Sequence, residues 1–243
     1  MIRFPSKANA LRFLRSAGVP IETIIDVGAN AETVELRQAF PDKRHILFEP
    51  AMEFHAALRK NYAGMDHLVA PVALSDQDGQ GSLRKIAIDG GAVSHAMLVD
   101  PNDGGPSENV QTMRLDSYMK ERDDQKPYLL KIDVDGYEIP IMRGSEGILR
   151  DVSCLIVEAP VATLAERLNF VLSKGFKLFD LVDQCYYFGV MSQVDMIFLS
   201  EEAFALPELR PWETRKFEWA GWVPVANFES AALPNVKIGR AHV

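Results

Sequence analysis

The amino-acid sequence predicts an α/β domain built on a doubly wound, mostly parallel sheet, with an antiparallel strand near its C-terminal edge. Short apolar runs of strand length alternate with amphipathic stretches of helical period between about residues 22 and 200. This alternation is typical of a parallel sheet covered on both faces. The last two apolar runs, Lys177–Val182 and Val194–Leu199, lie too close in sequence for a crossover helix. We therefore expect these two strands to pair antiparallel.

The other elements follow from local pattern. Earlier strands are indicated by apolar runs at Ile24–Val27, His45–Phe48, Leu68–Leu74, Tyr128–Ile132 and Ser153–Val157. Helices are indicated by apolar residues three and four positions apart, in stretches that end near proline or glycine. These stretches are Glu32–Phe40, Pro50–Tyr62, Pro140–Leu149 with a break near Gly144, and Ala162–Ser173.

Two segments are irregular. Turn-forming residues between Ser75 and Pro106 predict a hairpin and a long loop, Ala87–Asn109. The stretch from residue 205 holds four of the fourteen prolines and all three tryptophans, Trp212, Trp219 and Trp222. We expect a helical lead-in over residues 1–21, a main domain over residues 22–204, and an irregular arm over residues 205–243. The long loop and the arm are candidates to cover a substrate, although the arm could equally cover only apolar sheet surface.

Composition narrows the function classes. The chain has 243 residues, with 26 Lys and Arg against 34 Asp and Glu, and a formal net charge of −8. This balance argues against a nucleic-acid partner, whose phosphates need a basic surface. The two cysteines form no CxxC pair. The first residues lack the long apolar core of a signal peptide and no run approaches bilayer length, so we expect a cytoplasmic protein with no membrane partner.

The first strand–helix junction reads IIDVGANAETV. In doubly wound sheets ligands bind at the carboxyl ends of the strands. Gly28 allows a sharp turn and a close approach of backbone to ligand, and Asp26 ends the strand. A tight structural turn is the alternative interpretation of this motif.

The second junction, LFEP, places Glu49 at a strand end, 23 positions after Asp26. An acidic residue there is expected to accept hydrogen bonds from the ribose hydroxyls of a nucleoside. Asn30 and Thr33 occupy two glycine positions of the dinucleotide fingerprint. A ligand without a pyrophosphate, such as S-adenosylmethionine (SAM), therefore fits better than NAD.

A third junction, LLKIDVDGYE, places Asp133 at the end of a central strand, facing the same cleft. Asp135 and Glu138 follow closely and could bind a divalent ion together with Asp133. Equally, Asp135 with Gly136 could form a simple turn, and Glu138 could complement a helix start. Whether a metal takes part stays open at this point.

Together these junctions resemble the FkbM-type family of class I SAM-dependent methyltransferases. The matching stretches come in the family's order over residues 22–200: IIDVGAN, FPDKRHILFEP, VALSDQDG, MRLDSYM, LLKIDVDGYEIPIMRG and QVDMIFLS. The resemblance implies a Rossmann-like sheet of seven strands with an antiparallel seventh strand. It also implies an enzyme of the EC 2.1.1 type that transfers methyl groups, commonly to a hydroxyl of a sugar, polyketide or similar metabolite.

The resemblance also implies roles for single residues. The methionine part of SAM would contact Asp26, Gly28 and Asn30, while Glu49 would bind the ribose and Ser75 with Asp76 would lie near the adenine. The reaction centre would be flanked by Lys131, Asp133 and Glu138. One departure is Glu32, which stands where family members usually have glycine.

The leading hypothesis is an O-methyltransferase of a small hydroxylated acceptor, with Asp133 as the base and Lys131 or His95 as a second partner. The alternatives are a SAM-binding or nucleoside-binding module without activity and an NAD-dependent oxidoreductase. A homodimer is compatible with the sequence.

Overall fold

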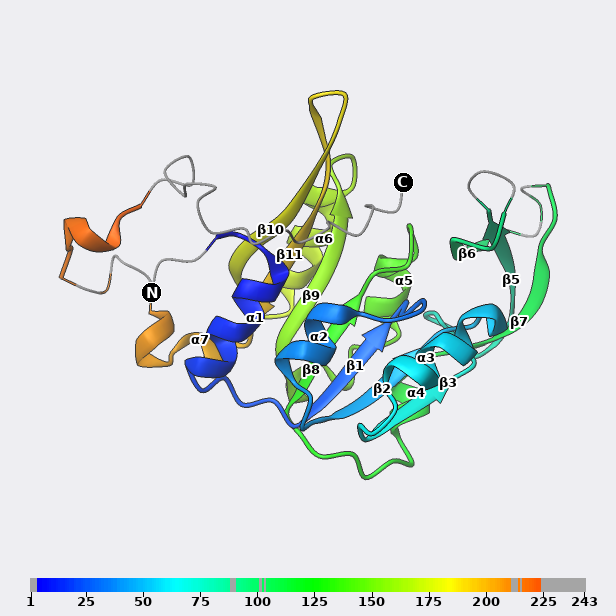
Figure 1. Cartoon of the computed structure of the whole chain (residues 1–243), viewed down its shortest axis with the longest axis horizontal. Coiled ribbons are helices and arrows are strands. Elements are labelled where there is room, and N and C mark those ends of the chain that lie inside the picture. Colours follow the sequence, from blue (N-terminus) through cyan, green and yellow to red (C-terminus); the bar gives the residue numbers. More distant parts are fainter. Residues whose placement is uncertain are drawn as a thin grey trace.

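The computed structural model describes residues 4–87, 91–100, 102, 104–210, 214 and 216–223. Its centre is a seven-stranded sheet with the strand order β10-β11-β9-β8-β1-β2-β3 (Figure 1). The strands of this sheet are β1 (Thr23–Val27), β2 (Arg44–Phe48), β3 (His67–Ala70), β8 (Tyr128–Ile132), β9 (Val152–Pro160), β10 (Lys177–Tyr187) and β11 (Val190–Leu199).

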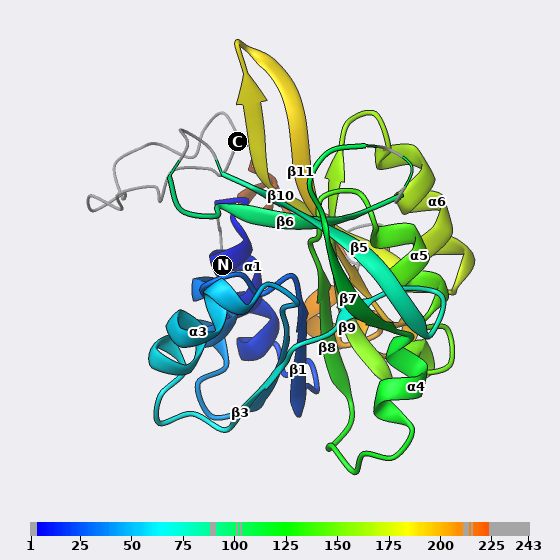
Figure 2. The ribbon, with the colours of Figure 1, turned by 90° about the vertical axis from the view of Figure 1, so that its right-hand side faces the viewer.

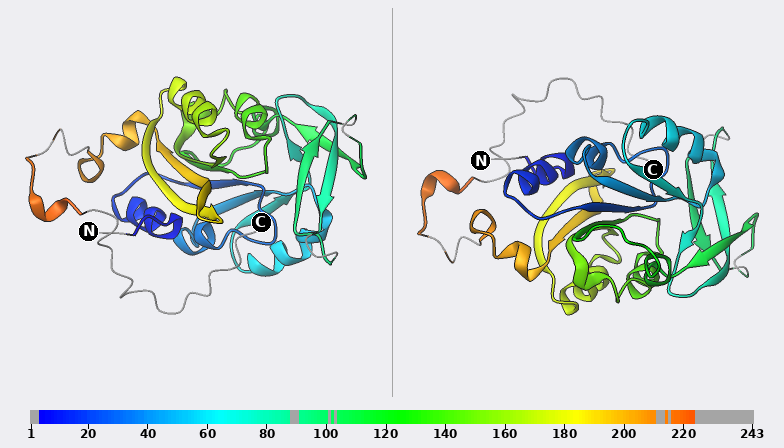
Figure 3. Two further views of the ribbon diagram at one scale, coloured as in Figure 1. Left: turned by 90° about the horizontal axis from the view of Figure 1, so that it is seen from above. Right: turned by 90° about the horizontal axis from the view of Figure 1, so that it is seen from below.

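A smaller sheet has four strands in the order β4-β7-β5-β6. Its strands are β4 (Ala73–Leu74), β5 (Gly79–Ile86), β6 (His95–Val99) and β7 (Glu108–Met113). It lies at the end of the molecule nearest β3 (Figures 1 and 3).

Helices cover both faces of the large sheet (Figure 2). The α-helices are α1 (Lys7–Ser16), α2 (Val34–Ala39), α3 (His55–Asn61), α4 (Leu115–Met119), α5 (Glu138–Arg143), α6 (Leu164–Ser173) and α7 (Glu201–Phe204). Short 3-10 turns are η1 (Met52–Phe54), η4 (Leu149–Asp151), η5 (Pro207–Leu209) and η7 (Trp219–Gly221).

The two faces of the sheet carry separate apolar cores. One core packs α4, α5 and α6 against residues such as Ile25 and Ile132. The other packs α1, α2 and α7 against residues such as Ile24 and Leu129. Neighbouring residues of one strand thus point to opposite cores, and β1 and β8 are buried throughout.

The predicted fold class is confirmed. The strands from β9 to β3 run parallel, and β11 runs antiparallel to both β9 and β10. The β10–β11 hairpin extends further than the apolar pattern indicates, to Tyr187 and Val190. Its turn residues, Phe188 and Gly189, both have positive φ, which suits the twist of a two-residue hairpin turn. The tip of this hairpin projects beyond the rest of the sheet (Figures 1 and 2).

Two sequence predictions about the smaller sheet are wrong. The run Leu68–Leu74 is not one strand, because β3 ends before Pro71 and β4 pairs with β7 in the other sheet. The segment Ala87–Asn109 is not one long loop, because it contains β6 and the start of β7. Strand β4 pairs with β7, 39 positions further along the chain, and such non-local pairing leaves little trace in the local pattern. Strand β6 pairs antiparallel with the preceding strand, β5.

The described part of the C-terminal arm does not cover the carboxyl ends of the strands. Leu209 belongs to the core around α1 and Leu206 packs against it, and the described residues of the arm lie at the opposite end of the molecule from the smaller sheet (Figures 1 and 3). Trp219 and Trp222 are exposed, and Trp212 lies outside the described residues. Within the described residues, none of the helices combines the length and hydropathy that crossing a bilayer requires.

Candidate active site

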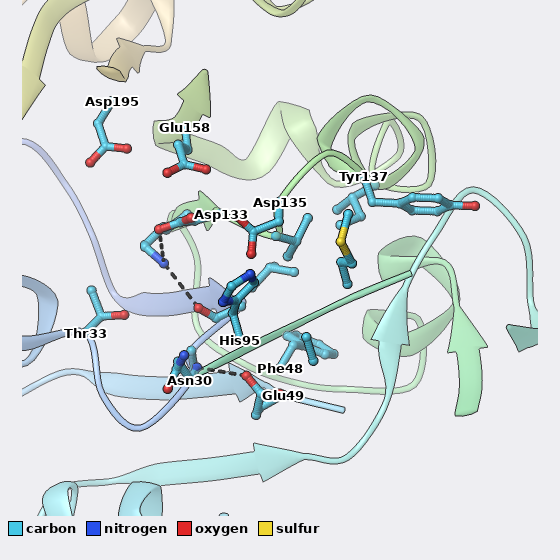
Figure 4. Close-up of a pocket in the computed structure, with 18 of the residues that line it drawn as sticks. Asn30, Thr33, Phe48, Glu49, His95, Asp133, Asp135, Tyr137, Glu158 and Asp195 are labelled. Atoms are coloured by element: carbon cyan, nitrogen blue, oxygen red, sulfur yellow. Dashed lines mark hydrogen bonds and ion pairs between the residues drawn. The ribbon is translucent and has the colours of Figure 1, made fainter. Parts of the chain in front are cut away.

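A cavity of about 880 Å³ lies at the carboxyl ends of the central strands. Figure 4 shows two groups of side chains in it. The first group, here called the glycine end, consists of residues 27–32 and 48–50 with the apolar wall 72–74. The second group, here called the charged end, consists of Lys7, Lys131, Asp133, Glu158, Asp183, Gln193 and Asp195.

Gly28 makes the tight turn after β1. Its φ is +79°, and a Cβ added to it would lie 1.9 Å from the carbonyl oxygen of Asp133. Only glycine fits between these two backbones. The turn therefore brings the end of β1 against the end of β8, and Gly28 lines the cavity at this point.

Glu49 closes the glycine end from β2. Its Oε2 accepts from the backbone N–H of Asn30 at 2.8 Å, and its Oε1 accepts from the backbone N–H of Ala51 at 2.9 Å. Asn30 also has positive φ, at 48°. Each carboxylate oxygen keeps a further lone pair for a ligand. Burial raises the pKa of Glu49 to about 7 against the effect of these two N–H donors.

Glu32, the departure from the family pattern, is paired. Its Oε2 lies 2.8 Å from the guanidinium of Arg37, five positions further along the chain in α2. The charge of Glu32 at the cavity wall, just before α2, is therefore balanced by a cation of that helix.

The smaller sheet contributes a wall through β6. The side-chain amide of Asn30 donates to the carbonyl oxygen of Ser94 at 2.8 Å, which ties the glycine turn to the start of β6. His95 lines the cavity, and its Nδ1 lies 3.0 Å from the Ser94 hydroxyl. His95 thus reaches the site from a strand rather than from the predicted loop.

Lys131 is a buried cation of the charged end. Its Nζ lies 3.1 Å from Asp26 and 3.2 Å from Asp133. Burial alone would lower the pKa of Lys131, but the carboxylates of Asp133 and Asp26 raise it above its ordinary value. Asp26 is fully buried and is absent from the cavity lining. The structure therefore places Asp26 beneath the cavity, as the partner of Lys131.

Asp133 and Glu158 form a carboxyl pair at the ends of β8 and β9. Both side chains line the cavity, and each affects the pKa of the other. Burial opposes ionisation of Asp133, but the charges of Lys131 and Lys7 hold its pKa below the ordinary value. Burial and the charge of Asp133 raise the pKa of Glu158 well above the usual range. Glu158 is therefore protonated and Asp133 ionised near neutral pH, so the pair holds one proton.

Glu138 does not line the cavity. It is fully buried, and its Oε2 lies 2.5 Å from the guanidinium of Arg167 in α6. Its Oε1 accepts from the backbone N–H of Gly136 at 3.2 Å. Arg167 also donates to the carbonyl oxygen of Glu158 at 2.6 Å. In this structure Glu138 and Arg167 support the loops that carry the carboxyl pair.

The remaining predicted residues lie beside the cavity. Ser75 and Asp76 follow β4 and are absent from the lining, whereas residues 72–74 just before them are present. The Ser75 hydroxyl donates to the Asp76 carboxylate at 3.3 Å. Across the residues that the structure describes, no group of three or more Asp, Glu, His or Cys side chains could hold a metal ion. The hypothesis of a divalent-ion site at Asp133, Asp135 and Glu138 therefore gains no support.

The sequence interpretation missed most of the charged end. Lys7 comes from α1, Glu158 from β9, Asp183 from β10, and Gln193 and Asp195 from β11. Glu158 accepts from the Gln193 amide at 2.6 Å. The one available signal is the position of Glu158 near the end of a predicted parallel strand, the same position that singled out Glu49 and Asp133.

Comparison with known protein families gives one match. The model of the "Methyltransferase FkbM domain" matches residues 26–178. No protein of curated function matches the chain.

Three solved structures show distant likeness. Precorrin-6y C5,15-methyltransferase from Geobacter metallireducens is 10% identical with a TM-score of 0.44, covering 79% of this chain and 89% of that chain. An rRNA methylase from Streptococcus thermophilus is 11% identical with a TM-score of 0.47, covering 83% and 99%. TrmK of M. capricolum, solved with S-adenosyl-homocysteine, is 12% identical with a TM-score of 0.43, covering 77% and 67%.

These low TM-scores add nothing to the domain match. That match extends from the end of β1 to the start of β10 and includes Gly28, Glu49 and Asp133. The chain therefore belongs to the FkbM family of SAM-dependent methyltransferases.

Proposed function

We propose that this methyltransferase transfers the methyl group of SAM to a hydroxyl of a small neutral metabolite, such as a sugar or a polyketide-like compound. The observation that carries the proposal is the single cavity that joins the glycine turn and Glu49 to the carboxyl pair Asp133 and Glu158. One end suits a nucleoside cofactor, and the other suits a group that must lose a proton.

The glycine end fits SAM. The backbone of Gly28, Ala29 and Asn30 lines this end of the cavity and suits the methionine part. Glu49 accepts hydrogen bonds from the ribose hydroxyls through its remaining lone pairs, and residues 72–74 offer an apolar wall for the adenine. Bound there, SAM supplies a methyl group on a sulfonium, a reactive carbon that needs no further activation.

At the charged end the acceptor hydroxyl donates to Asp133, whose side chain is 33% exposed to the cavity. The acceptor oxygen forms the new C–O bond while the S–C bond breaks, and the hydroxyl proton passes to Asp133. The product cofactor is S-adenosylhomocysteine. Lys131 keeps Asp133 ionised before the reaction, and holding the oxygen in line with the methyl group supplies much of the rate.

The charges favour a neutral or cationic acceptor. Besides the protonated Glu158, the charged end contains the carboxyl groups of Asp133, Asp183 and Asp195, against the ammonium groups of Lys7 and Lys131. A phosphorylated acceptor would bring further negative charge to a partly buried acidic site, at a large electrostatic cost. The same argument disfavours a nucleic-acid acceptor. The paired charge of Glu32 removes the main reason to infer an inactive binding module.

The test combines an acceptor screen with one variant. Formation of S-adenosylhomocysteine is measured with neutral polyols, sugars and phenolic compounds and with their phosphorylated counterparts. Asp133→Asn should lower turnover by about 100-fold, as expected for loss of a general base, and leave the SAM dissociation constant in calorimetry unchanged.

The matched control is Asp123→Asn, an exposed aspartate outside this cavity, which should keep full activity. Full residual turnover in Asp133→Asn, or a preference for the phosphorylated compounds, would contradict the proposal.

A further inference from the structure

Three elements outside the matched domain meet at the charged end of the cavity. The match covers residues 26–178, whereas Lys7 lies in α1, Asp183 in β10 and Asp195 in β11. All three side chains line the cavity. This part of the site is therefore built by segments that the domain model does not contain.

Lys7 ties these elements together. Its Nζ lies 2.5 Å from Asp195 and 3.9 Å from Asp183. Its backbone N–H donates to Oδ1 of Asp183 at 3.1 Å, and the N–H of Asp183 donates to the carbonyl oxygen of Pro5 at 3.3 Å. Asp183 has a positive φ of 52° where the β10–β11 register shifts, a conformation that surrounding contacts must hold. The start of α1 thus fixes the carboxylates of the hairpin against the cavity.

The Lys7 ammonium is also the second cation of a crowded acidic site. It is 8% exposed and acts on Asp133 as well as on Asp195. The charged and titratable groups around this cluster come from every neighbouring element: Asp26 of β1, Glu35 of α2, Lys131 of β8, Asp133 and Asp135 after β8, Glu138 of α5, Glu158 of β9, Asp183 and Cys185 of β10, and Asp195 of β11. Without Lys7, Lys131 would be the only ammonium group among them.

We propose that Lys7 is a positioning residue of the acceptor site, whose ammonium holds Asp195 and Asp183 in the cavity wall and sets the charge around Asp133. The proposal rests on the proposed function, because it treats Asp133 as the group that takes the acceptor proton. It adds a residue from α1 to the reaction that the matched domain performs.

The test measures the ionisation of Asp133 in the free protein, by NMR titration of ¹³C-labelled carboxyl groups. Lys7→Met removes a nearby positive charge, so Asp133 should titrate about one pH unit higher. Asp195→Asn removes a negative charge, so Asp133 should titrate lower. The double variant Lys7→Met/Asp195→Asn removes both charges and should return the titration close to that of the wild type. A residue that only stabilises the fold would not give these opposite signs.

Two further variants serve as controls. Lys7→Arg keeps the charge and should keep the wild-type titration. Lys43→Met removes a lysine paired at 2.7 Å with Glu22, away from the cavity lining, and should leave Asp133 unchanged. If Lys7→Met does not fold, Asp195→Asn and the double variant still test the proposal. Asp133 should titrate lower in Asp195→Asn, and the double variant should reverse this shift.

An unchanged Asp133 titration in both Lys7→Met and Asp195→Asn would overturn the proposal. Because the titration needs no acceptor, this outcome is separate from a failure of the proposed function, which the turnover of Asp133→Asn decides.

Discussion

The two ends of the cavity are built in different ways. The glycine end consists of a backbone turn at Gly28, a carboxylate held by two backbone N–H groups, and apolar wall residues. The turn and the carboxylate each come from one strand–helix junction, and the wall is the short run of residues 72–74 at β4. The charged end consists of side chains from five elements, held by ion pairs over long sequence separations, such as Lys7 with Asp195 and Lys131 with Asp26. Local geometry thus defines one end, and tertiary structure defines the other.

This difference explains how the two ends tolerate change. A backbone turn fails when an atom is added, because the two backbones have no space for it. A network of buried charges fails when an atom is removed, because the remaining partner keeps an uncompensated charge. We therefore expect an added atom to impair the glycine end and a removed partner to impair the charged end.

The largest effect is expected at the buried ion pair of Arg167 and Glu138, which lies next to the charged end. Arg167→Met leaves the fully buried Glu138 without its cation and removes the hydrogen bond to the carbonyl oxygen of Glu158. Breaking a buried pair in this way should lower the free energy of unfolding by about 3–5 kcal/mol, measured by urea denaturation.

Adding Glu138→Gln to Arg167→Met should recover part of this loss, because the buried charge is gone. The control is Lys174→Met in the same helix region, which breaks an exposed pair with Glu146 and should cost less than about 1 kcal/mol. Equal losses for Arg167→Met and Lys174→Met would contradict the supporting role of Arg167.

The next effect concerns the glycine end. Gly28→Ala places a methyl group 1.9 Å from the carbonyl oxygen of Asp133, in a backbone with φ of +79°. The turn must move away from β8, and SAM affinity should fall by about 100-fold, since a left-handed alanine also carries strain. Calorimetric titration with SAM measures the loss.

Gly64→Ala is the matched control for Gly28→Ala. Its φ is +84°, but a Cβ there meets nothing within 4 Å. It should carry the same backbone strain and bind SAM normally. If both variants bind SAM equally well, the close approach at Gly28 does not shape the site.

The same contrast shows how much the sequence could predict. The mostly parallel sheet, the antiparallel strand near its C-terminal edge and the places of Gly28, Glu49 and Asp133 at strand ends follow from runs and junctions of a few residues each. A local motif is sufficient there, because neighbouring residues build the feature.

The remaining features of the site and of the smaller sheet depend on contacts between distant residues, which no short sequence pattern contains. Glu138 has the right spacing for the reaction centre, yet its carboxylate turns to Arg167, 29 positions further along the chain. In the sequence, Lys7 is an ordinary lysine of a predicted helix. It becomes part of the site only through its contacts with Asp183 and Asp195 of the hairpin, 176 and 188 positions away. Strand β4 likewise depends on its pairing with β7, 39 positions further along the chain.

The smallest effect is expected at Glu49, the buried carboxylate of the glycine end. Burial raises its pKa to about 7, so in the ligand-free protein it is half protonated near neutral pH. Its folded pKa exceeds the unfolded value of 4.5. The stability that it contributes is therefore present below about pH 4.5 and is lost as the pH rises through about 7.

SAM binding should show the opposite trend with pH, because ribose hydroxyls donate to the ionised carboxylate. Wild-type affinity should rise about tenfold between pH 6 and pH 8 and change little above that, following the ionised fraction of Glu49. Glu49→Gln should bind more weakly and show no such slope. Glu53→Gln, a change at an exposed neighbour paired with Lys85, should keep the slope. A flat wild-type profile, or a slope that survives in Glu49→Gln, would show that the ribose does not bind at this carboxylate, and the glycine end would then hold its ligand through backbone alone.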